Sequence, residues 1–158
     1  AKINNKWMLF DITFGNGLIE ENVWKQKPDY FYFNIDKDLL KITHYPSSPF
    51  WISFFGQKKL NIFCNQPIYE NAYFKSNSKL ISPKLGELNI NNNKLTFEFK
   101  NLDPSIKISY KVDNTLKKPK KTLHKDTTYL VLTSPNKSSK LTLYFNNNSA
   151  LTYLITNK

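Results

Sequence analysis

Apolar and polar residues alternate with a period of two along most of the chain, which is the pattern of half-buried β-strands. The first run, residues 7–14, places Met8, Phe10, Ile12 and Phe14 on one face and stops at the turn residues 15–17. Similar runs recur to the end of the chain, at residues 30–35, 40–45, 88–90, 95–99, 106–112, 129–133, 141–145 and 151–155. The pattern predicts about nine or ten antiparallel strands and an all-β fold.

Short polar segments between these runs predict hairpins. Residues 30–45 are one candidate, and residues 129–145 are another. Residues 88–99 are the clearest candidate, because asparagines occupy positions 91–93 and tolerate the positive φ of tight turns. Helical spacing occurs only in residues 17–27, just before Pro28. We therefore expect at most one or two short helices.

Composition and length agree with this fold class. The 12 Phe and 9 Tyr suit pleated, half-buried surfaces. No linker or repeat divides the 158 residues, and this length fits one ordinary domain. The expectation is a single all-β domain over residues 1–158.

Several segments together resemble the lipocalin-like (calycin) small β-barrels of bacterial envelope proteins. They are Trp7 in the first strand, a short helix before Pro28, and the strand pairs expected at residues 30–45, 85–97 and 129–145. Asn5 stands where this family usually has the glycine of a Gly-x-Trp opening. The resemblance implies a single antiparallel barrel that binds a small apolar ligand inside.

A two-sheet β-sandwich is the alternative architecture, since strand number and alternation do not separate it from a barrel. Many envelope lipoproteins with this architecture act as scaffold or assembly subunits through protein–protein contacts. The sequence thus leaves two functions open: a carrier of a small apolar ligand, or a scaffold whose partner is an envelope protein.

The densest apolar segment is residues 50–56, with five large apolar residues in six positions. A strand with both faces covered would account for it, and so would the wall of an apolar pocket. For the carrier, the predicted ligand-binding residues are the four aromatics of this segment and a tryptophan that closes the base of the barrel: Phe50, Trp51, Phe54, Phe55 and Trp7.

The net charge is +11, and all 23 basic residues are lysines. Abundant Lys, Asn and Ile without Arg resemble the codon bias of an AT-rich genome, so two interpretations of the charge stay open: genomic drift for part of it, or selection for a polyanionic partner. The densest basic cluster lies in a predicted solvated loop, residues 117–125, and consists of Lys117, Lys118, Lys120 and Lys121. These lysines could touch anionic lipid headgroups weakly. Without arginine or interleaved aromatics, no specific nucleic-acid recognition is expected.

Residues with catalytic or metal-binding chemistry are sparse. His44, His124 and Cys64 have no metal-ligand spacing among them, and we expect two surface histidines. Alternation puts Cys64 on the face of Leu60 and Ile62, which predicts a buried structural thiol. No cofactor loop or nucleophile motif occurs. We expect a non-enzymatic protein with no catalytic residues, no metal and no cofactor.

No run reaches the roughly 20 apolar residues of a membrane-spanning helix. The chain begins Ala1-Lys2 and enters an apolar segment within a few residues, as a processed chain would. The resulting prediction is a periplasmic protein, or one anchored to a membrane by a lipoprotein leader that has been removed.

Overall fold

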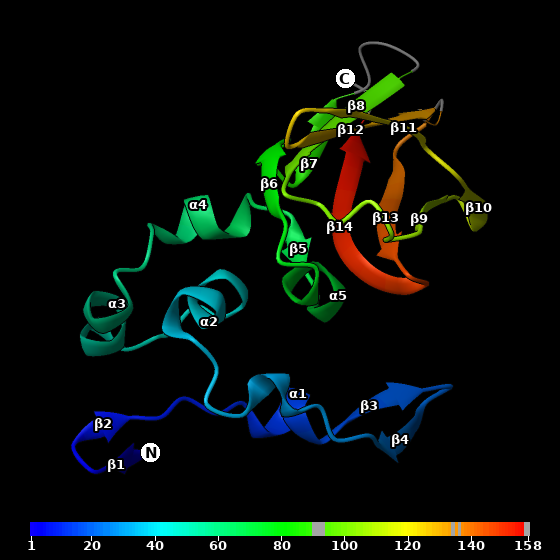
Figure 1. Ribbon diagram of the computed structural model, residues 1–158. Helices are drawn as coiled ribbons and strands as arrows, with labels where there is room; N and C mark the ends of the chain where they lie inside the picture. The colour runs from blue at the N-terminus through cyan, green and yellow to red at the C-terminus, as the bar shows by residue number, and fades with distance from the viewer. Residues whose placement is uncertain (90–93, 134, 136, 157–158) are drawn as a thin grey trace. The chain divides into compact units, whose positions relative to one another are not determined.

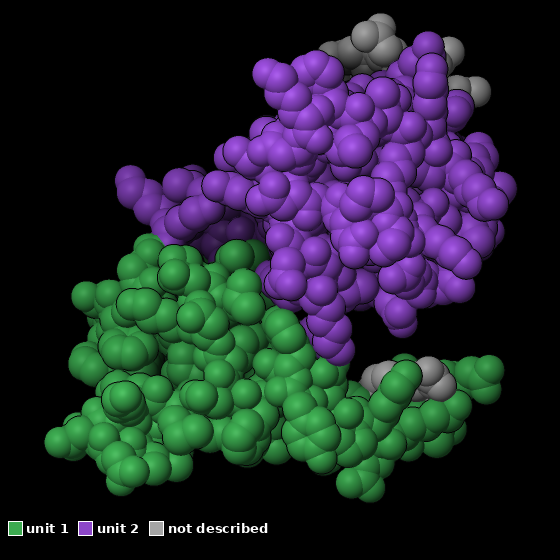
Figure 2. Space-filling model, in the orientation of Figure 1, with its two compact units in different colours: residues 1–57 green, residues 58–158 purple. Residues whose placement is uncertain are grey.

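The computed structural model describes residues 1–89, 94–133, 135 and 137–156 (Figure 1). Contacts divide the chain into two compact units, residues 1–57 and residues 58–158, which Figure 2 colours separately. They are called here the N-terminal unit and the C-terminal unit, and each is described by itself. A single domain over residues 1–158 stays a prediction.

The N-terminal unit consists of small hairpins and short helices rather than long strands. The run at residues 7–14 is a strand only at its first residue, because a helix begins at Ile12. The elements are β1 (Lys2–Ile3), β2 (Lys6–Trp7), α1 (Ile12–Asn16), β3 (Gly17–Glu20), β4 (Val23–Gln26), the 3-10 helix η1 (Tyr30–Tyr32), α2 (Lys37–Thr43) and α3 (Pro49–Phe55).

Residues 17–27 form a hairpin where the spacing predicted a helix. β3 pairs with β4 and places Ile19 opposite Trp24. The turn residues Glu21 and Asn22 have φ values of 53° and 62°. Two successive left-handed residues make the two-residue turn that matches strand twist. Ile19 and Trp24 are five positions apart in sequence and face each other across this turn, so the hairpin contains part of the spacing that we assigned to a helix.

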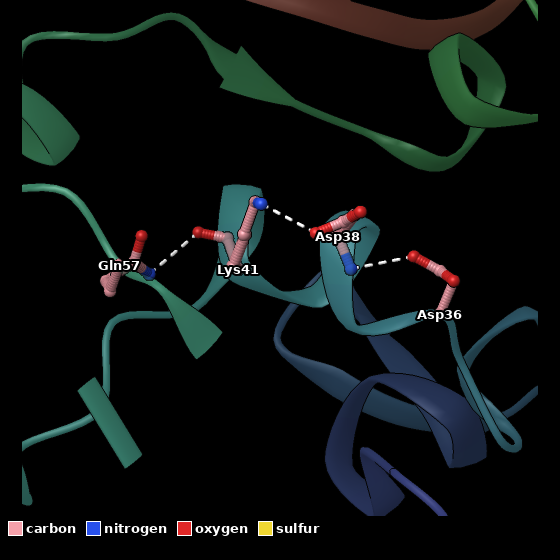
Figure 3. A network of polar contacts seen from close by, with 4 residues as sticks. All are labelled: Asp36, Asp38, Lys41 and Gln57. Carbon is pink, nitrogen blue, oxygen red and sulfur yellow. Dashed lines mark hydrogen bonds and ion pairs between the residues drawn. The ribbon is translucent and has the colours of Figure 1, made fainter. Parts of the chain in front are cut away.

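The predicted hairpin over residues 30–45 is wrong, since this segment contains η1 and α2. Carboxylates at the two helix starts explain the difference: Asp29 accepts a hydrogen bond from the Phe31 N–H at 3.0 Å, and Asp36 accepts one from the Asp38 N–H at 2.7 Å. Side-chain caps of this kind stabilise helix starts by satisfying backbone donors. Figure 3 shows the Asp36 cap and the ion pair of Lys41 with Asp38 at 2.6 Å.

Gln57 follows α3 and Gly56 in the chain, and its side chain contacts the C-terminal end of α2. Its Nε2 donates to the carbonyl oxygens of Lys41 and His44, both at 2.8 Å. The Lys41 contact is visible in Figure 3. One side chain thus satisfies two carbonyls at a helix end, where backbone acceptors lack partners within the helix.

The C-terminal unit is built from two antiparallel sheets and two short helices (Figure 1). The larger sheet runs β10-β9-β13-β14, with β5 and β7 both paired to β14, and the smaller sheet runs β11-β12-β8-β6. Among the pairings of the described strands, that of β14 with β7 is parallel and the others are antiparallel. The elements are α4 (Leu60–Cys64), β5 (Ile68–Tyr69), α5 (Asn71–Lys75), β6 (Lys79–Ser82), β7 (Glu87–Asn89), β8 (Lys94–Lys100), β9 (Ile108–Val112), β10 (Thr115–Lys117), β11 (Lys120–His124), β12 (Thr127–Thr133), β13 (Ser139–Phe145) and β14 (Asn148–Thr156).

The two sheets of the C-terminal unit share one hydrophobic core. The rings of Phe97 and Tyr153, from opposite sheets, meet edge-on with centroids 5.1 Å apart, and those of Phe99 and Phe145 meet at 5.7 Å. Phe97 and Phe99 are fully buried, as is Leu130 beside them. Face-to-face packing of two sheets around interdigitated side chains is the arrangement of a β-sandwich.

Neither sheet closes on itself in the described part of the chain, and no strand pairing joins the two. The prediction of an all-β fold is therefore confirmed in its coarse form, whereas a single barrel is not supported. The physical reason is that alternation specifies which face of a strand is buried but not whether the buried face curls into a barrel or meets a second sheet.

Two expected hairpins of the C-terminal unit are wrong, although their strands exist. β7 and β8 lie in different sheets, and so do β12 and β13. The predicted turn residues 91–93 lie outside the described residues. The observed hairpins close instead at Asp113-Asn114, at Lys125 and at Asn146-Asn147, where each of these residues has positive φ.

The number of helices also differs from the prediction of one or two. The described residues contain five α-helices and one 3-10 helix, and no α-helix exceeds seven residues. No helix in the described ranges is long and apolar enough to cross a membrane.

Candidate functional site: an aromatic cluster and a basic edge

The five residues predicted to bind a ligand lie together in the N-terminal unit. The Trp7 ring on β2 meets the Trp51 ring on α3 edge-on, with centroids 5.1 Å apart. Trp51 also contacts the rings of Phe50, Phe54 and Phe55, at 5.0, 5.4 and 6.1 Å. Trp7, Phe50, Trp51, Phe54 and Phe55 are called the aromatic cluster below.

The aromatic segment is a helix, not the strand or sheet corner expected from its apolar density. Pro49 occupies the first turn, where its missing N–H costs nothing. Gly56 ends the helix in the left-handed conformation, with φ of 57° and ψ of 45°. Between these two residues, positions four apart share a helix face, so Phe50 stacks beside Phe54 at 6.5 Å.

The residues of the aromatic cluster differ in solvent exposure. Phe55 is buried, whereas 61% of Phe50 and 42% of Trp7 are exposed. The Lys37 Nζ lies 5.8 Å from the centre of the Phe54 ring, which is a cation–π contact. The cluster is therefore an aromatic platform at the surface of the N-terminal unit. Its binding of a ligand stays a prediction.

The rest of the N-terminal unit also exposes large apolar side chains. Among the side chains described in residues 1–57, the buried large apolar ones are Tyr32, Ile35 and Phe55. The exposed ones, besides Trp7 and Phe50, are Ile3, Ile12, Ile19, Val23, Trp24, Tyr30 and Phe33. Exposed apolar residues outnumber buried ones in this unit, the reverse of an ordinary core-forming segment.

The two units differ in formal net charge. Residues 1–57 contain six lysines and six acidic residues, so they carry no formal net charge. The other seventeen lysines and six acidic residues give the whole net charge of +11 to residues 58–158. Any attraction for anions therefore belongs to the C-terminal unit.

The predicted basic loop at residues 117–125 is mostly strand. Lys117 ends β10, and Lys120 and Lys121 begin β11. Residues 118 and 119 between the two strands and Lys125 after β11 lie outside the strands. Lys117, Lys118 and Lys120 are exposed, as predicted. Lys121 Nζ donates to the carbonyl oxygens of Pro104 and Ile106, at 2.9 and 3.4 Å, and so holds the residues that precede β9.

The two histidines and the cysteine lie in or next to three different elements of the fold. His44 is partly buried at the end of α2, and its Nε2 lies 2.6 Å from the Asp11 Oδ2. Its Nδ1 lies 2.7 Å from the Thr43 Oγ1. His124 is exposed on β11, as predicted. Cys64 is exposed at the end of a helix, so the prediction of a buried thiol on a strand is wrong.

Asp11 is the residue of this group that sequence reasoning missed. It precedes α1 and lies far from His44 in sequence, so spacing carried no signal of the pair. The Thr43 hydroxyl is also 3.1 Å from the Leu40 carbonyl oxygen. The three side chains Asp11, Thr43 and His44 thus close the C-terminal end of α2. In the described part of the chain, no three His, Cys, Asp or Glu side chains come together as metal ligands.

A depression of about 360 Å³ lies in the C-terminal unit and is lined in part by Pro83, Leu85, Leu88 and Leu95. It is open to solvent, and none of the predicted ligand-binding residues lines it. The carrier interpretation required an enclosed, aromatic-lined cavity of a few hundred Å³. This depression is not such a cavity.

Comparisons with known proteins place the chain in no family. No family model matches the sequence, and no curated protein matches it. Among solved structures, the chain is similar to three immunoglobulin-type domains, titled "IG27 protein domain", "Crystal structure of I81 from titin" and "Solution NMR structure of titin I27 domain mutant".

These similarities cover 51% of this chain and 94%, 96% and 87% of the three domains, respectively. The identities are 11%, 18% and 11%, with TM-scores of 0.35, 0.34 and 0.35. Similarity at these TM-scores carries no argument about fold or function. The strand pairing and the shared core of the two sheets define the sandwich of the C-terminal unit.

Proposed function

We propose that this chain is a non-enzymatic scaffold protein that acts through protein–protein contacts, with the aromatic cluster as a contact surface. The observation that carries the proposal is the distribution of large apolar side chains. In the C-terminal unit many of them fill the space between two sheets, whereas in the described part of the N-terminal unit more of them are exposed than buried. Large exposed apolar surfaces mark interaction sites on soluble proteins.

The type of side chain in the aromatic cluster also favours a protein partner. Trp, Tyr and Phe are enriched in protein–protein interfaces, where they bury large areas at a low cost in conformational entropy. Phe50 and Trp7 present such area at the surface, beside the partly buried rings of Trp51 and Phe54. Because Trp51 contacts four other rings, it is already held in place before a partner arrives.

The filled interior of the C-terminal unit argues against a carrier of the lipocalin type. In a lipocalin-type barrel, the inward-facing side chains of the strands line the cavity. Here the inward-facing side chains pack against the opposite sheet, as the ring of Phe97 does against the ring of Tyr153. Eight residues of this core have no exposed surface: Phe97, Phe99, Leu130, Leu141, Leu143, Ala150, Leu151 and Ile155. A location in the bacterial cell envelope, with an envelope protein as the partner, remains part of the proposal.

A small apolar ligand is the second candidate, favoured by the continuity of the five rings around Trp51. Such a ligand would lie on the exposed rings of Phe50 and Trp7 rather than inside a sheet. In that case the N-terminal unit would bind the ligand and would be the part of the chain that acts as a carrier.

Photo-cross-linking separates the two candidates. A benzoylphenylalanine in place of Phe50, introduced in the cells that make this chain, should give a discrete cross-linked species containing a second protein. The same substitution at Thr96, which is exposed on β8, is the control and should give none. The cross-link should disappear when an excess of the unlabelled chain competes for the partner.

Titration of tryptophan fluorescence with oleate tests the ligand candidate on the same surface. We expect no saturable change, because a scaffold surface has no site for a single acyl chain. A saturable change that Phe50→Ala weakens, together with no cross-link at position 50, would overturn the scaffold proposal in favour of the ligand.

A further inference from the structure

β11 is the most open edge of the two sheets. It pairs with β12 through all five of its residues, and no described strand pairs with its other side. All five residues, Lys120–His124, are exposed. On an edge strand, every second residue directs its backbone N–H and C=O away from the sheet, where another strand can bind them.

The other described edges are less able to accept a strand. β5 contains two residues, β7 and β10 contain three each, and short edges offer few backbone groups. β6 has an irregular register against β8 between Leu80 and Ser82. Bulges of this kind turn an edge away from regular pairing. β11 alone combines length, regular register and exposure among the described edges.

The chain segment that contains β11 carries charge of one sign, although Asp103 lies close enough to Lys121 to interact with its charge. Residues 114–125 contain five lysines and no acidic residue. Lys121 is held by the carbonyl oxygens of Pro104 and Ile106, which leaves Lys117, Lys118, Lys120 and Lys125 around the edge. The nearest acidic residue on the C-terminal side, Asp126, is already paired with Lys100 at 3.1 Å. An incoming strand therefore meets a positive potential.

Like charges exclude a second copy of this chain as the occupant of the edge. Two β11 strands side by side would bring the lysines of one against the lysines of the other, and like charges opposite each other destabilise a sheet. Lysines on an edge are a common defence against self-pairing. The same charges attract a strand of opposite sign.

We propose that β11 is a docking edge for an extended, acidic segment of another protein, which adds to the smaller sheet as a fifth strand. Backbone hydrogen bonds to β11 would hold the segment, and carboxylates at alternate positions would lie beside Lys120 on the outer face of the sheet. β11 belongs to the C-terminal unit, whereas the aromatic cluster consists of residues of the N-terminal unit. The inference does not depend on the function proposed for that cluster.

A peptide of about nine residues, in which glutamate alternates with valine, is the probe for this edge. Its binding to the full chain is measured by fluorescence anisotropy. Two further peptides carry backbone N-methyl groups at every second residue, one on each alternate set, and keep the same charge. Only one set can point its N–H groups at β11, so one methylated peptide should bind at least about tenfold more weakly and the other should bind like the parent.

Charge variants of the protein test the place of binding. The double variant Lys118→Glu/Lys120→Glu should weaken binding of the unmodified peptide at least about tenfold. Lys137→Glu/Lys140→Glu is the matched control: it changes the net charge equally, but both lysines are exposed outside the β10–β11 segment. The control should weaken binding less than about threefold. Far-ultraviolet circular dichroism confirms that both variants fold, and the methylated peptides test the same edge on the unaltered chain.

Three results would overturn the proposal. Equal binding of both methylated peptides and the parent would mean that charge alone attracts the peptide. Equal losses in the two charge variants would mean that the edge is not the site. Binding to phosphatidylglycerol–phosphatidylcholine vesicles through Lys118 and Lys120, with no peptide binding, would assign the lysines to a membrane surface instead. In each case a cross-link at Phe50 would leave the scaffold proposal intact.

Discussion

Tyr153 shows how a single polar side chain is accommodated in the core of the C-terminal unit. Only 1% of the residue is exposed, and its hydroxyl donates to the Pro83 carbonyl oxygen at 3.1 Å. Burial raises its pKa well above the ordinary value, with smaller contributions from the nearby Tyr69 and Tyr73. Burial also raises the pKa of Tyr69 to about 12 and raises that of Tyr73.

These shifts predict a loss of stability at alkaline pH. Unfolded tyrosines ionise near pH 10, whereas the buried ones keep their protons to higher pH. Below pH 10 the contribution of the neutral rings to stability is complete. Between about pH 10 and 12 the unfolded chain binds fewer protons, so the free energy of unfolding should fall by up to about 1.4 kcal/mol per pH unit for each such tyrosine.

Urea unfolding measured from pH 9 to pH 12 tests this prediction. Tyr153→Phe should reduce the slope, because the ring can no longer ionise in the unfolded state. Tyr30→Phe is the control and should leave the slope as it is, since 83% of Tyr30 is exposed in the fold. Equal slopes in all three proteins would contradict the assignment.

At the scale of the element, backbone hydrogen bonds at the C-terminal end of α3 stabilise this helix together with the contacts of its aromatic face. The N–H of Gly56 donates to the Ile52 and Ser53 carbonyl oxygens, and the Gln57 N–H bonds to the Ile52 carbonyl oxygen at 2.9 Å. This closure requires the left-handed conformation at position 56. A Cβ added to Gly56 would meet no atom within 4 Å, so only the backbone restricts the choice of residue.

Gly56→Ala should therefore lower the free energy of unfolding of the N-terminal unit by about 1 kcal/mol. Gly56→Asn should lower it by less, because asparagine tolerates positive φ. Trp51 lies in α3, five residues before Gly56, so tryptophan fluorescence during urea unfolding measures both variants. Equal costs for alanine and asparagine would contradict the role assigned to the positive φ at this position.

At the scale of the whole molecule, the core and the tryptophans lie in different units. The large hydrophobic core cluster belongs to residues 58–158. All three tryptophans, Trp7, Trp24 and Trp51, belong to residues 1–57, where few apolar side chains are buried. Buried apolar area is the main source of folding stability.

Tryptophan fluorescence should consequently change at a lower urea concentration than far-ultraviolet circular dichroism, to which the sheets of the C-terminal unit contribute most. Phe97→Ala serves as the control. It should lower the free energy of unfolding of the C-terminal unit by about 3–5 kcal/mol, so the dichroism transition moves to a lower urea concentration. The earlier fluorescence transition should not move. Coincident transitions would instead support the single domain predicted from the sequence.

Period-two alternation was sufficient to predict the strands that later proved to be β8, β9, β12, β13 and β14. In β9, for example, Tyr110 and Val112 are buried on one face, as the pattern required. The same pattern contains no information on which strand lies beside which. β12 and β13 follow each other in sequence yet join different sheets, because pairing depends on contacts between residues far apart in the chain.

The sequence by itself determined that the chain is rich in strands and that its charge is basic. It also determined that the segment from Phe50 to Phe55 has more large apolar residues than one face of a half-exposed strand can bury. The tertiary structure decided that these rings meet around Trp51 on a helix, and that the sheets pack as a sandwich. The physical reason is that local patterns specify which side chains avoid water, whereas helix caps, turn conformations and distant partners specify where those side chains go.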